Sequence, residues 1–165
     1  MKILYVDMDG VLCDFEGHFF KVSNMDPETL SYEEIKEVVN RHGRRFWENM
    51  PWTEIGPKLW GEIKHYNVAI LSNPANFKES KKGKSIWIRE NLGEGVDYIL
   101  AEKKSAFANH EAMLIDDTEE NINSFEASGG HGVFLRDDER GLERSLNIIH
   151  SFFNNYNHVG DYEKD

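Results

Sequence analysis

Short apolar runs recur along the chain, separated by longer amphipathic stretches. Most of these runs do not alternate with polar residues, which is typical of strands buried on both faces of a sheet. The runs are Ile3–Val6, Val68–Leu71, Tyr98–Ala101, Ala112–Ile115 and Val133–Leu135. Between them, apolar residues three or four positions apart predict helices at Lys58–His65, Phe77–Leu92, Thr118–Ala127 and Arg140–Phe153. The alternation predicts an α/β fold, a doubly wound parallel sheet of about five strands with helices on both faces.

The segment after the first apolar run breaks this alternation. Residues 14–57 show no strand pattern, but an Asp-Pro pair at 26–27 and a capping box at 31–34 mark two helix starts. We therefore predict that residues 14–57 form a small helical cap. The core of the domain would then consist of residues 1–13 and 58–153. The polar and acidic residues 154–165 are expected to form a C-terminal tail.

Composition and charge narrow the range of partners and compartments. The 165 residues include 30 acidic and 19 basic side chains, a formal charge of −11, and this disfavours binding to polymeric nucleic acid. No apolar run is long enough to span a membrane, and the N-terminus does not resemble a signal peptide. Cys13 is the only cysteine, so no internal disulfide can form. A cytoplasmic protein is expected, and a homodimer is left open.

Polar residues follow four of the apolar runs. They lie at Asp7–Gly10, Ser72–Pro74, Glu102–Lys104 and Asp116–Asp117. The carboxyl ends of parallel strands share one edge of a sheet, where ligands bind, so these segments are expected to meet in one crevice. The aspartates among them would repel one another unless a divalent cation lay between them. Because Mg²⁺ prefers oxygen ligands and pairs with phosphate, the residues predict a magnesium-dependent phosphoryl-transfer site.

Each polar residue has a place in such chemistry. Asp7 would attack phosphorus as the nucleophile. Asp9 would donate a proton to the leaving oxygen and later deprotonate the attacking water. Gly10 would allow a tight turn that brings backbone N–H groups to the phosphate. Ser72 and Asn73 would donate to phosphate oxygens, and a lysine would neutralise charge on the transferring group.

These segments resemble the four ordered motifs of the haloacid-dehalogenase-like (HAD) phosphatases. Asp7–Leu12 matches the first motif, Val68–Asn73 the second and Leu114–Asp117 the fourth, while Lys103 or Lys104 would supply the third. The order and spacing agree over nearly the whole chain. The resemblance implies a Rossmann-like HAD fold with a cap inserted after the first strand, Mg²⁺ as cofactor and an aspartyl-phosphate intermediate.

Within that superfamily the chain most resembles the 5′(3′)-deoxyribonucleotidases. The resemblance rests on the run Asp7–Phe15, the pair Phe46-Trp47 before a proline, the turn Ser72–Pro74, and Lys84 three residues before Trp87. It implies that the substrate is a nucleoside monophosphate and favours a deoxynucleotide over a ribonucleotide. The cap differs most from that family.

The resemblance also implies a role for each matched aspartate. Asp7 would be both the nucleophile and a metal ligand. Asp9 would be the acid/base, and its backbone carbonyl would bind the metal. Asp117 would be the third protein ligand, with Asp116 beside it holding a metal-bound water.

The remaining implied roles concern the substrate. Ser72 and the third-motif lysine, for which Lys104 fits the family pattern better than Lys103, would hold the phosphate. Phe15, with Phe46 or Trp47 from the cap, would line the pocket for the base and sugar. The sequence is equally consistent with Phe46 and Trp47 packing in the hydrophobic core of the cap.

Other interpretations stay open at this point. A basic run at Lys78, Lys81, Lys82 and Lys84 is either a solvated helix face or a source of positive charge near the mouth of the site. The substrate could instead be a sugar phosphate or another small phosphoester, since no residue pattern in the cap indicates which substrate it binds. A polynucleotide 3′-phosphatase is a further alternative, and a non-catalytic nucleotide-binding module ranks lowest.

Overall fold

The fold is built on one parallel sheet of five strands. The computed structural model describes residues 1–154, so the predicted tail lies outside the described residues except for Asn154. The strands run in the order β3-β2-β1-β4-β5. Their bounds are β1 Ile3–Val6, β2 Val68–Ser72, β3 Asp97–Leu100, β4 Ala112–Asp116 and β5 His131–Phe134. The central place of β1, with the chain winding outward on both sides of it, confirms the predicted doubly wound sheet.

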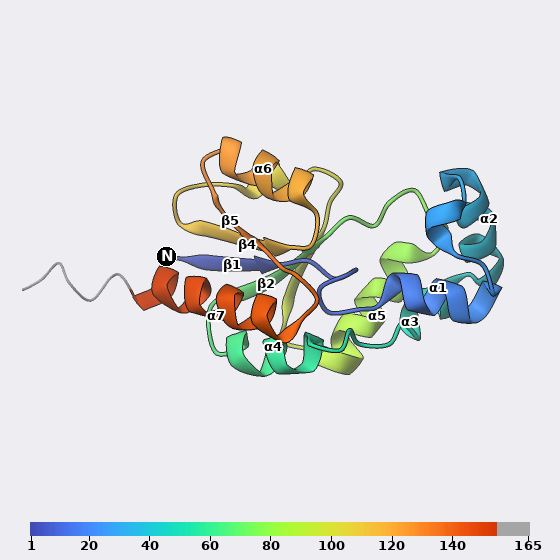
Figure 1. Cartoon of the computed structure of the whole chain (residues 1–165), viewed down its shortest axis with the longest axis horizontal. Coiled ribbons are helices and arrows are strands. Elements are labelled where there is room, and N and C mark those ends of the chain that lie inside the picture. Colours follow the sequence, from blue (N-terminus) through green and yellow to red (C-terminus); the bar gives the residue numbers. More distant parts are fainter. Residues whose placement is uncertain (155–165) are drawn as a thin grey trace, which may run out of the picture.

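Helices cover both faces of the sheet because side chains alternate along each strand. Leu4 and Val6 face a large apolar cluster together with α4 (Gly56–Ile63), α5 (Ser80–Leu92) and α7 (Glu139–Asn154). Tyr5 faces a smaller cluster on the other side, covered by α6 (Glu119–Ala127) and the short helix η2 (Lys104–Phe107). Figure 1 shows α6 on one side of the strands, with α4 and α7 on the other.

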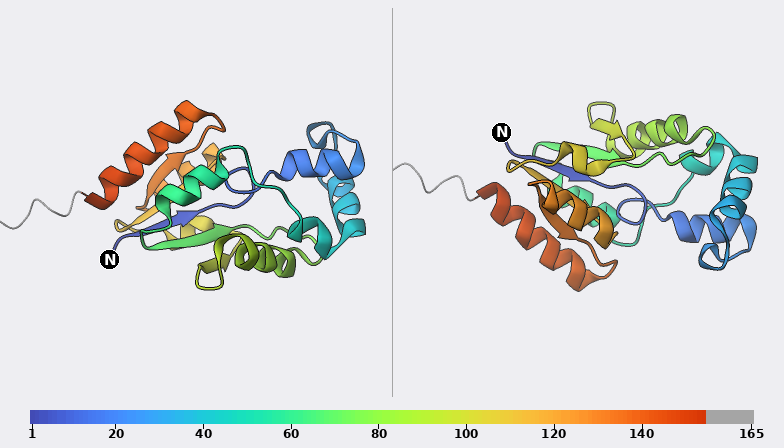
Figure 2. Two further views of the ribbon diagram at one scale, coloured as in Figure 1. Left: turned by 90° about the horizontal axis from the view of Figure 1, so that it is seen from below. Right: turned by 90° about the horizontal axis from the view of Figure 1, so that it is seen from above.

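A group of helices inserted after β1 lies beyond the carboxyl ends of the strands (Figures 1 and 2). It comprises α1 (Phe15–Ser23), η1 (Pro27–Thr29), α2 (Tyr32–His42) and α3 (Arg44–Glu48). The predicted capping box is confirmed, since the Ser31 hydroxyl accepts from the Glu34 N–H and the Glu34 carboxylate accepts from the Ser31 N–H. We call this group the cap.

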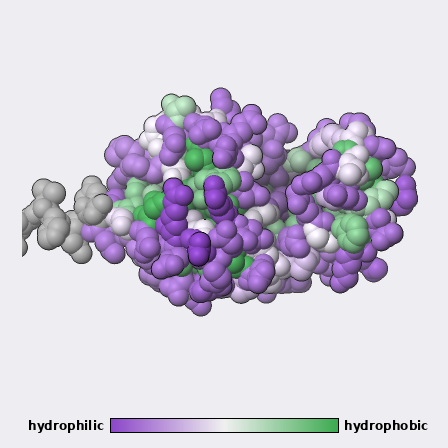
Figure 3. Space-filling view, in the orientation of Figure 1, coloured by the Kyte–Doolittle hydropathy of each residue, from purple (hydrophilic) through white to green (hydrophobic). Residues whose placement is uncertain are grey.

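The face of the molecule seen in Figure 3 is mainly hydrophilic. The same view shows the outline narrowing between the larger lobe that holds the sheet and the smaller lobe formed by the cap. No helix within residues 1–154 has the length and apolar character needed to cross a membrane.

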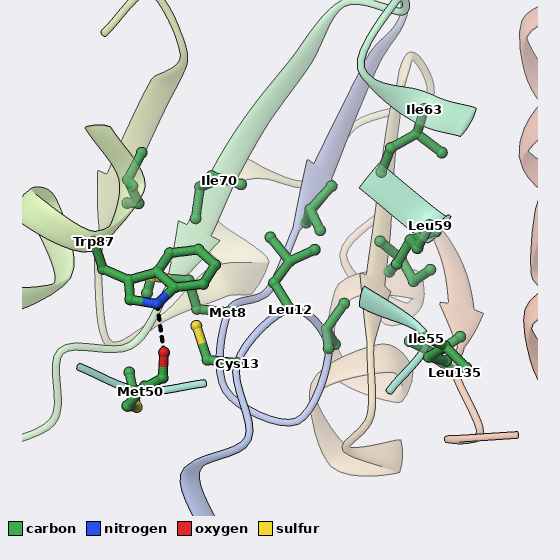
Figure 4. Packing of buried hydrophobic residues seen from close by; sticks show 14 of the residues in the cluster. Met8, Leu12, Cys13, Met50, Ile55, Leu59, Ile63, Ile70, Trp87 and Leu135 are labelled. Carbon is green, nitrogen blue, oxygen red and sulfur yellow. Dashed lines mark hydrogen bonds between the residues drawn. The ribbon is translucent and has the colours of Figure 1, made fainter. Parts of the chain in front are cut away.

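The cap is anchored to helix α5 of the core. The Trp87 indole N–H donates to the Met50 carbonyl at 2.8 Å, and the two residues lie within one apolar cluster (Figure 4). The Trp52 indole N–H donates to Asn91 Oδ1 at 3.1 Å. Helix α3 packs directly on α5 where Gly83 lies against Trp47. The chain leaving the cap is therefore fixed to the core by both hydrogen bonds and close packing.

Gly83 makes the closest approach of cap and core possible, so Gly83→Ala is expected to destabilise the fold. A Cβ at Gly83 would lie 2.4 Å from Trp47 Cβ, whereas a Cβ at Gly61, in helix α4, meets nothing within 4 Å. Helix propensity alone favours Ala over Gly by about 1 kcal/mol at both positions. Thermal unfolding should show Gly61→Ala more stable than the wild type, and Gly83→Ala less stable by about 1–3 kcal/mol. Equal stabilisation by both would contradict this packing.

Candidate active site

The loop after β1 places two carboxylates at the carboxyl edge of the sheet. Asp7 directly follows the strand, and its N–H donates to the Ile115 carbonyl of β4 at 3.0 Å. The next turn closes on itself, because the N–H groups of Leu12 and Cys13 donate to the Met8 carbonyl. Asp7 is only 6% exposed. Its side chain is therefore held at the centre of the sheet edge by backbone bonds on both sides.

Gly10 lets this loop approach the end of β4. Its φ of 77° lies in the left-handed region, which favours glycine. A Cβ at this position would lie 1.9 Å from Asp117 Oδ2. Only a residue without a side chain can therefore place the Asp7 loop against Asp117.

Lys104 joins the ends of β1 and β4 through a buried ion pair. Its Nζ lies 2.7 Å from Asp7 Oδ1 and 2.5 Å from Asp116 Oδ2. Asp116 is also held by the Thr118 N–H and by the Asn121 amide. The structure therefore brings Lys104 into the site, whereas Lys103 is exposed beside it. Sequence reasoning missed Asn121, which lies one helical turn beyond Asp117.

The carboxylates of Asp7, Asp116 and Asp117 form a group that fits a divalent cation. One oxygen from each lies within 4.8 Å of the others. With Asp9, the sheet edge carries four carboxylates, and the buried Lys84 and Lys104 supply two ammonium groups. When all are ionised, one divalent cation would balance the remaining negative charge. Hard oxygen ligands of this kind are those that Mg²⁺ takes. The Asp9 carboxylate is not in this group, so only its backbone carbonyl remains as the ligand expected from the sequence.

The protonation of the group reflects the crowding of negative charge. Burial raises the pKa of Asp7 to about 7, against the opposing effect of Lys104 and with further raising by Asp116 and Asp9. Desolvation and the Asp116 charge raise the pKa of Asp117 to about 6. Burial lowers the pKa of Lys104, but Asp7 and Asp116 outweigh it and the net direction is upward. The protein without a cation thus holds charges that it poorly accommodates at neutral pH.

The turn after β2 supplies the third part of the site. Ser72 is fully buried, whereas Asn73 is exposed and lines the cavity above. The Asn73 Oδ1 accepts from the Ala75 N–H at 2.7 Å, which leaves its amide N–H groups for a ligand. Ser72 Oγ accepts from Lys84 Nζ at 3.0 Å.

Lys84 lies at the site, apart from the rest of its basic run, for which the sequence left open both a solvated helix face and a source of positive charge near the site. It is 0% exposed, and its Nζ lies 2.5 Å from Asp9 Oδ2. By contrast, Lys78, Lys81 and Lys82 are exposed, as for a solvated face. The helical spacing held the missing signal, since position 84 falls on the same stripe as the buried Trp87 and Ile88.

A cavity of about 690 Å³ lies between this cluster and the cap. Its floor includes Asp7, Asp9 and Asp117. Its walls carry aromatic side chains from both lobes, namely Phe15, Tyr32, Trp47, Phe77 and Phe134. A volume of this size suits a small molecule.

The aromatic residues expected from the sequence divide into two groups. Phe15 and Trp47 line the cavity, although Trp47 is only 1% exposed, whereas Phe46, which is also 1% exposed, does not line it. Phe46 instead packs against Phe15, Trp47 and the ring of His18. Phe77 is an additional wall residue, which lies 5.3 Å from the Trp47 ring between ring centroids. The sequence pattern placed Phe77 at the start of a helix, but α5 begins at Ser80, so Phe77 lies in the loop before it.

Asp7→Asn is expected to stabilise the cation-free protein at pH 8. The folded pKa of about 7 exceeds the ordinary aspartate pKa of 3.8, so the charged form of Asp7 opposes folding and this cost grows as the pH rises between these values. Thermal unfolding in EDTA should show a higher Tm for Asp7→Asn by about 5 °C at pH 8, and a smaller gain at pH 5.

Asp97→Asn, at an exposed position on β3, is the matched control and should leave the Tm unchanged at both pH values. Adding Mg²⁺ at pH 8 should raise the Tm of the wild type and not that of Asp7→Asn. A lower Tm for Asp7→Asn at pH 8 would contradict the assigned burial of charge.

Comparison with known proteins gives matches in structure alone. No family model matches the sequence, and no curated protein matches it. Several solved structures do match over most of their length.

Three of these structures share the architecture at low sequence identity. The HAD-hydrolase YfnB of Bacillus subtilis, bound to magnesium, aligns with a TM-score of 0.56 and 12% identity, over 88% of this chain and 98% of that one. A HAD-superfamily hydrolase of subfamily IA from Geobacter sulfurreducens gives 0.54 and 18%, over 82% and 87%. A Bacteroides vulgatus protein named as a beta-phosphoglucomutase gives 0.51 and 14%, over 88% and 81%. The chain therefore has the fold of the HAD-superfamily hydrolases, as its sequence motifs predicted.

Proposed function

We propose that this chain is a Mg²⁺-dependent phosphomonoesterase that hydrolyses nucleoside monophosphates in the manner of the 5′(3′)-deoxyribonucleotidases. The observation that carries the proposal is the buried Asp7, which Lys104 holds beside Asp116 and Asp117 at the floor of a cavity. A carboxylate so placed can attack a phosphorus atom whose charge is neutralised by its surroundings.

The reaction follows from the positions of the side chains. An oxygen of Asp7 attacks phosphorus to form an aspartyl-phosphate, while Asp9 gives a proton to the leaving alcohol oxygen. Water then attacks the phosphorus and passes a proton to Asp9, and the bond to Asp7 breaks. A bound Mg²⁺ would supply positive charge to the phosphate oxygens, with Asp7, Asp117 and the Asp9 carbonyl as its protein ligands.

The lining of the cavity favours a substrate with an aromatic base. Rings from Phe15, Tyr32 and Phe77 offer stacking surfaces, and stacking on aromatic side chains tolerates any base.

A sugar phosphate is a second candidate substrate. The cavity lining also carries Asp14, Glu16 and Asp137, whose carboxylates can accept from sugar hydroxyl groups. The Bacteroides vulgatus protein of the same fold, named as a beta-phosphoglucomutase, is in keeping with this alternative. Phosphate release from deoxynucleoside monophosphates, ribonucleoside monophosphates and hexose phosphates would discriminate between the two.

Asp7→Asn is expected to abolish turnover, because an amide is a poor nucleophile. With a deoxynucleoside monophosphate and Mg²⁺, kcat/KM should fall by about 10⁴-fold or more. EDTA should stop the wild-type enzyme, and added Mg²⁺ should restore it. Substantial activity of Asp7→Asn would exclude the covalent route, and activity unchanged by EDTA would exclude the metal.

Phe77→Ala is expected to weaken the binding of nucleotides. Loss of one stacking surface costs about 1–3 kcal/mol, which corresponds to a rise in KM of about 5- to 100-fold. The KM for a hexose phosphate should change much less. Phe20→Ala, which removes an exposed ring on the cap surface, is the matched control. Equal rises for both substrates would indicate a disturbed cap instead of a lost base contact.

A further inference from the structure

We infer that three carboxylates in the wall of the substrate cavity select phosphate esters whose leaving group carries no negative charge of its own. They belong to Asp14, Glu16 and Asp137, which we call the rim carboxylates. The inference rests on the proposed phosphatase function and adds a substrate class to it. A nucleoside monophosphate is accepted, whereas a nucleoside diphosphate or bisphosphate is rejected.

The rim carboxylates come from both lobes of the molecule. Asp14 is the N-cap residue of α1 and Glu16 lies in the first turn of that helix, so both stand at the start of the cap. Asp137 lies in the loop between β5 and α7 of the core. All three line the cavity whose floor holds Asp7. A leaving group that extends outward from a phosphate at Asp7 therefore meets carboxylates from two sides.

The rim carboxylates have no cationic partner within residues 1–154. The side chains of Glu16 and Asp137 take part in no ion pair or hydrogen bond there, and Asp14 accepts from the Gly17 N–H at 2.8 Å. Among the described residues, Arg136 is the one basic residue that lines the cavity, and it forms no ion pair with them. Three carboxylates against one guanidinium leave this part of the wall negative.

The negative charges around the rim are close enough to act on one another. Burial raises the pKa of Asp137, and the charges of Glu54, Asp14 and Asp138 raise it further. A carboxyl group responds in this way to like charges nearby. The two buried lysines do not relieve this crowding, because both pair with carboxylates on the floor of the cavity.

The aromatic part of the wall acts in the same direction. Rings of Phe15, Tyr32 and Phe77 belong to the lining, and the face of an aromatic ring carries partial negative charge. A neutral base gains stacking on such rings. A second phosphate would lose water there without gaining a partner, and like charges brought together suppress binding. The cavity wall thus favours a neutral leaving group over an anionic one.

Three esters that differ in the charge at one end test this selection. Each is a phenyl phosphate with a para substituent, which is 2-hydroxyethyl, carboxymethyl or 2-aminoethyl. At neutral pH these substituents are neutral, anionic and cationic, and methylene groups separate their charge from the ring. With the wild type, Mg²⁺ and low salt, kcat/KM should be about tenfold lower for the carboxymethyl ester than for the hydroxyethyl ester. The aminoethyl ester should react at least as well as the neutral one.

Removing or screening the charges should abolish this discrimination. The double variant Glu16→Gln/Asp137→Asn removes two charges at nearly constant size, and should reduce the tenfold ratio to about two. Raising the ionic strength from about 0.05 M to about 0.5 M should reduce the wild-type ratio likewise, because salt screens exposed charges. A merely structural role would not respond to salt in this way.

Asp97→Asn is the matched control for net charge. It removes one carboxylate at an exposed position on β3, outside the cavity lining, and should keep the tenfold ratio. Should the double variant fail to fold by circular dichroism, the two single variants and the salt series replace it. Should the enzyme act on nucleotides alone, thymidine 5′-monophosphate and thymidine 3′,5′-bisphosphate replace the neutral and anionic esters.

The outcomes separate this inference from the function on which it rests. A ratio that falls in the double variant and at high salt supports the inference. A wild type that hydrolyses the anionic ester as well as the neutral one, or a ratio that persists without the two carboxylates or at high salt, overturns it while the phosphatase function stands. A wild type that releases phosphate from no ester and no nucleotide overturns both.

Discussion

The site depends on the pairing of charges that are buried at one edge of the sheet. Lys104 bridges Asp7 and Asp116, and Lys84 holds Asp9, so the two ammonium groups together fix three carboxylates from two segments of the chain. Buried ion pairs contribute little net stability, because desolvation offsets their attraction. The gain is therefore in geometry: with two lysines against four aspartates, the cluster retains negative charge that a divalent cation can neutralise.

The remainder of the fold serves to hold these charges in place and to enclose them. The parallel order of the strands brings the ends of β1, β2 and β4 to one edge. The cap closes the space above this edge, and its attachment to α5 through Trp87 and Gly83 sets the distance between the two lobes. Burial of Asp7, Asp116 and Lys104 lowers the local dielectric, which strengthens the electrostatic interactions among them.

Helix α5 links the chemistry of the site to the walls of the cavity. One face of the helix carries Gly83, against which Trp47 packs, and Lys84, whose ammonium lies beneath the same indole ring. The indole thus covers the Lys84 ammonium and also forms part of the cavity lining. Both features depend on the packing of α3 on α5.

The sequence alone determined the elements and the main residues of the site. Buried strands are visible in the sequence as apolar runs, and residues such as Asp7 and Asp116 follow these runs directly. The parallel sheet and its carboxyl edge were therefore predictable. Only the tertiary structure separated Lys104 from Lys103, placed Phe46 behind the cavity wall and brought Lys84 to Asp9. These outcomes depend on contacts between residues far apart in the chain, such as the 75 positions between Lys84 and Asp9. Local periodicity carries no information on such contacts, because they are set by how helices and loops pack.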